Sequence, residues 1–311
     1  IFKLNTIKMS SNQSASALKK PEPKRSSSIE FFGGCLAGVV QVLSGQPFDT
    51  VKVRLQTQPA GSKIYTGVLD CVKKIWMLEG PAAFYKGTAF PLLGIGACVS
   101  IQFGVVEESK RQLKRLFNKT ELNNSLLFLA GAISGVANAV VSIPVEHLRI
   151  RMQIQDQSNR IYQNSWDCFR KISGNYGIQG LYKGTMVTLL REFWCYGLYF
   201  AVYDLTVKAL KAPGEEKVAL WKAGFAGALA GTGFWFFGYP IDIVKTRLQA
   251  DSWEAPKYKG SVDCFNQMLK FEGPKSFVKG IQPCLSRAAP VNALGFITYE
   301  TVVSALSPKY Q

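Results

Sequence analysis

An acidic residue and two basic residues recur three times in this chain, each time after a proline and before a glutamine. In every copy the acid stands two residues after the proline, and the first base stands three residues after the acid. Side chains three positions apart lie on nearly one face of a helix. Around a common axis, each acid could therefore meet the base of the next copy. The copies occupy residues 47–56, 144–153 and 240–249, at intervals of 97 and 96 residues.

These charges lie inside apolar stretches, where a charge is costly unless it is paired or in water and therefore marks a polar pathway. Further positions keep the same interval, including Lys86-Gly87, Lys183-Gly184 and Lys279-Gly280. A period this long, held over the whole chain, indicates one unit built three times.

Each unit must position its polar motif with two apolar stretches, since a helix needs about 20 apolar residues to cross a bilayer. The stretches are 31–58, 88–106, 126–155, 185–211, 221–250 and 281–305. Between them, segments such as 69–78 and 165–176 have the pattern of short surface helices. The sequence thus predicts an all-α protein with six transmembrane helices in three tandem pseudo-symmetric repeats of about 97 residues, each with a short surface helix.

The predicted organisation is a polar leader over residues 1–29 and a domain over 30–311, with repeats near 30–123, 124–218 and 219–311. A proline inside a helix removes one hydrogen bond and kinks it, so we expect Pro47, Pro144 and Pro240 to bend three helices toward the axis. Glycine pairs at four-residue spacing (34 and 38, 131 and 135, 227 and 231) favour close helix contact.

Composition excludes several classes of protein. The net charge of +16 could suit nucleic acid, but the bases recur at fixed repeat positions beside apolar stretches, which favours a membrane protein. Seven scattered cysteines and one histidine give no metal-ligand spacing, and no nucleophile, base and acid stand together. We therefore expect no metal, no cofactor, no enzyme activity and no nucleic acid partner.

Over about residues 30–305 the chain resembles the mitochondrial carrier family. The family pattern Pro-x-acid-x-x-base-x-base is met in all three repeats, and acid-Gly…base-Gly is met by Glu79-Gly80…Lys86-Gly87 and Glu272-Gly273…Lys279-Gly280. Tyr176 replaces the acid in the second repeat, which should weaken a local contact. The resemblance implies a matrix-side gate formed by Asp49, Lys52, Glu146, Arg149, Asp242 and Lys245, braced by Gln56, Gln153 and Gln249.

The family carries a second, cytoplasmic-side ring, which is depleted here. The resemblance assigns Glu107, Lys110, Asp204 and Glu300 to it, but Val207 and Val303 stand where bases are needed. We expect at most one full ion pair at that end. The resemblance also implies a monomer in the mitochondrial inner membrane, with both termini toward the intermembrane space.

Helix starts bind phosphate through free backbone N–H groups. In this family such places are similar to cardiolipin sites, and ordinary helix capping is the alternative. The positions concerned are Gly67, Gly87, Gly184, Gly260 and Gly280.

The resemblance places substrate contacts on the even-numbered helices, at Cys98, Arg191, Glu192 and Arg287. Two arginines and a glutamate suit a small molecule with a carboxylate and an amine. These residues resemble the amino-acid and carnitine branch, and most of all the fungal and plant carriers linked to glutamate and glycine metabolism. Trp194, Tyr196 and Trp235 could form an aromatic box for carnitine, with ordinary packing as the alternative.

Two functions remain open at this point. The first is a transporter or antiporter that moves a small zwitterionic or carboxylate metabolite (an amino acid, or carnitine or acylcarnitine) by alternating access through a central cavity. The second is a carrier-fold protein that serves as a structural subunit of a larger inner-membrane assembly.

Overall fold

The computed structural model describes residues 27–58, 64–155, 160–211 and 220–306. Six long helices dominate this part of the chain, two in each repeat, as the sequence predicts. They are α1 (Ser27–Thr57), α3 (Ala89–Leu116), α4 (Asn124–Ile154), α6 (Thr185–Leu210), α7 (Leu220–Ala250) and α9 (Ile281–Leu306). The shortest has 26 residues, or about 39 Å at 1.5 Å per residue, which exceeds the roughly 30 Å of a bilayer core.

The expected surface helices are present in all three repeats. They are α2 (Val68–Glu79), α5 (Ser165–Leu181) and α8 (Ser261–Glu272). Short 3₁₀ turns, η1 (Pro81–Tyr85) and η2 (Pro274–Val278), follow α2 and α8. In the second repeat the same turn is merged into α5 across Gly177, whose φ of 66° is left-handed and favours glycine.

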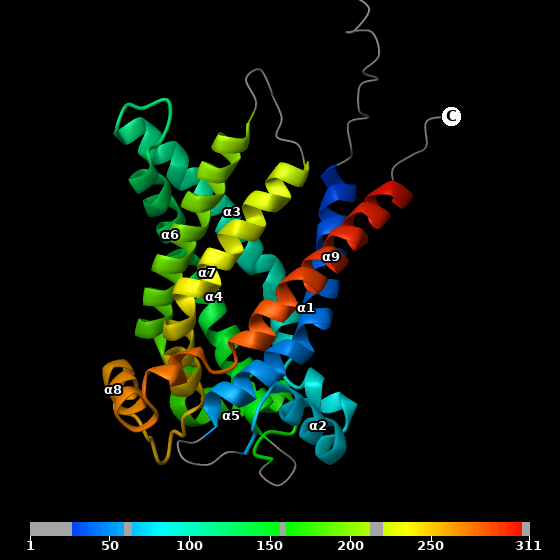
Figure 1. Cartoon of the computed structure of the whole chain (residues 1–311), viewed down its shortest axis with the longest axis vertical. Helices are drawn as coiled ribbons and strands as arrows, with labels where there is room; N and C mark the ends of the chain where they lie inside the picture. The colour runs from blue at the N-terminus through cyan, green and yellow to red at the C-terminus, as the bar shows by residue number, and fades with distance from the viewer. Residues whose placement is uncertain (1–26, 59–63, 156–159, 212–219, 307–311) are drawn as a thin grey trace, which may run out of the picture.

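The three surface helices lie together at one end of the molecule (Figure 1). The start of α1 and the end of α9 lie at the opposite end, which we call the terminal end. Neighbouring repeats join by long helices that run side by side, α3 with α4, α6 with α7, and α9 with α1. At the surface-helix end, α1, α4 and α7 contact one another, which brings the three polar motifs together.

Among the residues that the structure describes, two segments qualify as membrane spans by length and composition alone, Pro81–Leu116 and Asn124–Ile154. The helices α1, α4 and α7 continue through Pro47, Pro144 and Pro240.

The glycine pairs are used unequally. A Cβ on Gly135 would stand 2.4 Å from the backbone oxygen of Glu192, and one on Gly131 would stand 2.5 Å from that of Tyr196, so α4 and α6 pack backbone to backbone. The equivalent Gly227 and Gly231 of α7 would meet nothing within 4 Å. The expected close contact therefore holds for the second repeat and is wrong for the third in this conformation.

Candidate functional site

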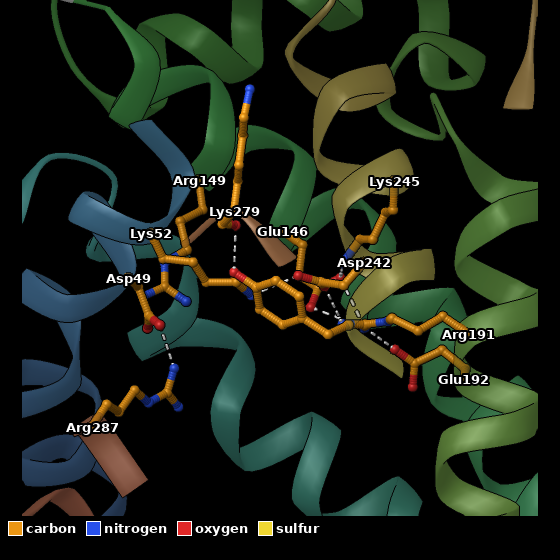
Figure 2. Close-up of polar contacts among 11 residues, drawn as sticks. Asp49, Lys52, Glu146, Arg149, Arg191, Glu192, Asp242, Lys245, Lys279 and Arg287 are labelled. Atoms are coloured by element: carbon orange, nitrogen blue, oxygen red, sulfur yellow. Dashed lines mark hydrogen bonds and ion pairs between the residues drawn. The ribbon is translucent and has the colours of Figure 1, made fainter. Parts of the chain in front are cut away.

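Three ion pairs join the repeats in a ring where α1, α4 and α7 meet (Figure 2). Each acid reaches the first base of the following repeat, as the three-residue spacing predicts. The side chains are largely buried, so these pairs are shielded from water. The pairs are Asp49 with Arg149 at 2.6 Å, Asp242 with Lys52 at 2.6 Å, and Glu146 with Lys245.

A second ring lies further toward the surface-helix end and uses the second base of each motif. These arginines donate to backbone carbonyls at the end of the next helix in the set α1, α4 and α7, where carbonyls lack partners within the helix. The bonds run from Arg54 to Gln153 at 3.0 Å, from Arg151 to Ala250 at 3.1 Å, and from Arg247 to Gln56 at 2.8 Å.

In the first and third repeats an acid supports this second ring. Glu79 pairs with Arg54 and with Lys86 at 2.6 Å, and Glu272 pairs with Arg247 and Lys279 in the same way. These four cations therefore share two carboxylates.

The second repeat, where Tyr176 stands in place of the acid, is built differently. Tyr176 stacks on Trp253 at 4.8 Å between ring centroids, and the Lys183 ammonium lies 4.5 Å from the Trp253 ring. Lys183 donates to the carbonyls of Asp251 at 2.7 Å and Ser252 at 2.9 Å. Within the described residues Arg151 makes no ion pair. The lost carboxylate is thus replaced by an aromatic stack that joins two repeats, rather than leaving only a weaker contact.

A cavity of about 360 Å³ lies against the first ring, and all four predicted substrate residues line it. Arg191 points between Glu146 and Asp242, donating to them at 3.2 and 3.0 Å, and it also pairs with Glu192 (Figure 2). Arg287 pairs with Asp49. Both arginines therefore touch the ring acids directly, which sequence spacing alone did not indicate.

Glu192 has one oxygen, Oε2, that is buried without a hydrogen-bond partner in the described structure. Its side chain is 1% exposed. The charged residues lining the cavity are five cations against four carboxylates, a net excess of one positive charge (5 − 4 = 1). They are Lys52, Arg149, Arg191, Lys245 and Arg287 against Asp49, Glu146, Glu192 and Asp242.

The comparison with known proteins divides the chain into the same three repeats. Residues 23–117, 120–213 and 216–310 each match the family model described as mitochondrial carrier protein. The chain belongs to the mitochondrial carrier family. It is therefore a mitochondrial membrane carrier of small molecules and not an enzyme.

Curated relatives match this carrier over nearly their whole length. The glutamate/glycine mitochondrial carrier ymc1 of Schizosaccharomyces pombe is 47% identical, covering 89% of this chain and 94% of the relative. The human mitochondrial basic amino acids transporter is 40% identical, covering 89% of this chain and 90% of the relative. The mitochondrial glycine transporter YMC1 of Saccharomyces cerevisiae is 37% identical, covering 89% of this chain and 91% of the relative.

The predicted aromatic box of the carrier is not assembled. Tyr196 and Trp235 line the cavity, but Trp194 lies on another face, 54% exposed and edge-on to Phe128 at 5.6 Å. The Lys52 ammonium already lies 4.5 Å from the Trp235 ring.

The three motif glutamines of the carrier make no hydrogen bond to the ion pairs in the described structure. Gln153 donates to the Thr50 hydroxyl at 3.1 Å, while the buried side-chain amides of Gln56 and Gln249 have no partner there. Instead Gln46, which the sequence did not single out, accepts from Arg149 at 2.5 Å and donates to the Lys86 carbonyl at 2.9 Å. Its position just before the proline of the motif was the available signal.

At the terminal end of the carrier, Lys110 pairs with Asp204 on α6 at 2.9 Å and with Glu107 on its own helix at 3.2 Å. The Glu300 side chain lies outside the described residues. Within those that are described, one ion pair links two helices of the predicted second ring.

The five predicted lipid positions of the carrier stand at helix starts. Gly67 and Gly260 precede α2 and α8. Gly87, Gly184 and Gly280 have left-handed φ values of 79°, 78° and 76° just before α3, α6 and α9. A cavity of about 660 Å³ lies between Gly67 and Gly280.

Proposed function

We propose that this carrier exchanges amino acids across the mitochondrial inner membrane by alternating access. The observation that carries the proposal is the contact of Arg191 and Arg287 with the acids of the first ring, beside the unbonded oxygen of Glu192. The relatives are named for glutamate, glycine and basic amino acids, and these names support this substrate class.

In this proposal the first ring is the matrix gate, and the surface-helix end faces the matrix. The termini then face the intermembrane space. Desolvation offsets much of the attraction within buried ion pairs, so such a ring can hold a conformation without locking it.

An incoming amino acid would bind through both of its charges. Guanidinium groups bind carboxylates in a bidentate fashion, so Arg191 and Arg287 would take the substrate carboxylate. Glu192 Oε2 would take the ammonium. The carboxylate would then compete with Asp49, Glu146 and Asp242 for the arginines, so that binding loosens the gate.

Amino acids fit the cavity better than carnitine does. A quaternary ammonium needs open aromatic faces, but Lys52 covers Trp235 and Trp194 faces away from the cavity. Cys98 adds a small, uncharged wall.

The remaining assignments are part of the same proposal. Cardiolipin would bind at the glycines that begin α2, α3, α6, α8 and α9. The Lys110–Asp204 pair would be what remains of the cytoplasmic gate, and the protein would act as a monomer. The prolines of α1, α4 and α7 would allow these helices to bend.

The test is exchange in cardiolipin-containing liposomes loaded with glycine, glutamate, ornithine, arginine, carnitine or ADP. We expect exchange of at least one amino acid, and its loss in Arg191→Ala and Glu192→Gln. Exchange of carnitine or ADP alone would overturn the substrate assignment. A folded protein that is silent across the panel would favour the structural role, as would amino-acid exchange unaffected by both substitutions.

A further inference from the structure

A hydrogen bond crosses the cavity between α3 and α6. The side-chain amide of Gln102 donates to the Tyr196 hydroxyl, and both residues line the same cavity as Arg191, Glu192 and Arg287. Tyr196 follows Glu192 by four residues, which places it one turn, or about 6 Å, closer to the terminal end on the same helix face. We call this Gln102–Tyr196 link the crossbar.

Neighbouring helices hold the crossbar in place. The Ser134 hydroxyl of α4 donates to the backbone carbonyl of Gln102 at 2.7 Å. The Phe234 ring of α7 meets the Tyr196 ring edge-on at 5.3 Å between centroids, and the Phe200 ring of α6 stacks with the Tyr196 ring at 6.3 Å. Side chains packed from two helices lose little further freedom on binding a ligand, so the crossbar can act as a fixed boundary.

A second link repeats the connection nearer the terminal end. Lys110 and Asp204, which pair at 2.9 Å, each follow a crossbar residue by eight positions. The helices α3 and α6 are thus joined at two levels, both on the terminal-end side of the substrate residues. The space left for a bound molecule is bounded by the ion pairs on one side and by the crossbar on the other.

The chemistry of this boundary does not favour a long cationic side chain. The amide and the hydroxyl bond to each other, and neither carries a charge. Three of the cavity's carboxylates are paired with the bases of the ring, and Glu192 is the one with an unbonded oxygen. A basic amino acid that used Glu192 for its α-ammonium would therefore find no further carboxylate for its side chain.

We propose that the Gln102–Tyr196 crossbar determines substrate size, admitting short amino acids and excluding long basic ones. This proposal rests on the proposed amino-acid exchange. It assigns a specificity role to two residues for which the described structure gives no hydrogen bond to the ion-pair ring or to the two arginines.

The test compares initial uptake of glycine and arginine by the full chain in cardiolipin-containing liposomes. Wild type should favour glycine. Tyr196→Ala should raise the arginine-to-glycine ratio by about tenfold, the lower range for a change of one methylene in an apolar pocket. Gln102→Ala should raise it as well, and Tyr196→Phe, which keeps the ring but loses the bond, should raise it less.

Trp194→Ala is the matched control, since it removes an aromatic ring from the same helix on a face away from the cavity. Ratios within twofold of wild type in Tyr196→Ala and Gln102→Ala, or an equal change in the control, would overturn the crossbar while leaving amino-acid exchange standing. A wild type that favours arginine would also overturn it. If wild type exchanges no amino acid, both proposals fall.

Discussion

Replacing Arg191 by methionine should destabilise the carrier far more than the same change at Arg287. The Arg191 side chain is 6% exposed and touches Glu146, Glu192 and Asp242. The Arg287 side chain is 32% exposed and has one ion-pair partner among the described residues, Asp49. In the Arg191→Met variant Glu146 keeps Lys245 and Asp242 keeps Lys52, but Glu192 loses the cation that pairs with it.

Removing one partner of a buried ion pair costs about 3–5 kcal/mol, because the other charge is left without compensation. Removing a partly exposed pair costs about 1 kcal/mol or less. Since Asp49 also retains Arg149, Arg287→Met belongs to the second class. We therefore expect the loss of unfolding free energy to be several times larger for Arg191→Met.

The assay is thermal unfolding in detergent with cardiolipin, with Glu192→Gln added to the Arg191→Met background. If the stranded Glu192 charge causes the loss, the double variant should recover most of the melting temperature. Equal shifts for the two arginines, or a further loss in the double variant, would refute the reasoning.

Two pairs of variants test features outside the substrate site. Burial, together with the neighbouring charge of Arg151, lowers the pKa of Lys183 from 10.5 to about 8. Between these values the unfolded chain binds more protons than the folded one, so stability should rise with pH from 8 to 10. The melting temperature should rise less steeply between pH 8 and 10 in Lys183→Gln than in wild type, whereas Lys86→Gln should keep the wild-type slope. A wild-type slope in both variants would contradict this. Gly135→Ala should cost about 1–3 kcal/mol through overpacking against α6. Gly231→Ala, at the same repeat position with nothing within 4 Å, should be neutral or slightly stabilising, so equal melting shifts would refute the packing argument.

The repeat interval was sufficient to predict the six long helices, the surface helices and the ring of ion pairs. The reason is that acid and base positions are local: three residues on a helix fix which face they share, and three-fold repetition fixes their partners. Arg191 and Arg287 also stand 96 residues apart, which puts them at equivalent positions of two repeats.

Contacts between repeats that do not involve the charges of the repeated motif could not be predicted from the sequence pattern. Tyr176 and Trp253 belong to different repeats, and nothing in their spacing indicates that their rings stack. Trp194 and Tyr196 stand two residues apart on α6, so one faces away from the cavity when the other faces into it. The helix α3 runs ten residues past its apolar stretch because residues 107–116 carry charge pairs such as Glu107–Lys110 that suit an exposed helix.

The second ring has a consequence for how the chain folds. Arg54, Arg151 and Arg247 each complete their hydrogen bonds on the backbone of the following repeat, and the third returns to the first. One or two repeats alone would leave helix-end carbonyls, and the guanidinium N–H groups that bond to them, without these partners, which is costly for groups buried in the fold. The triplicated chain should therefore fold as one cooperative unit, and single repeats should not accumulate as stable fragments.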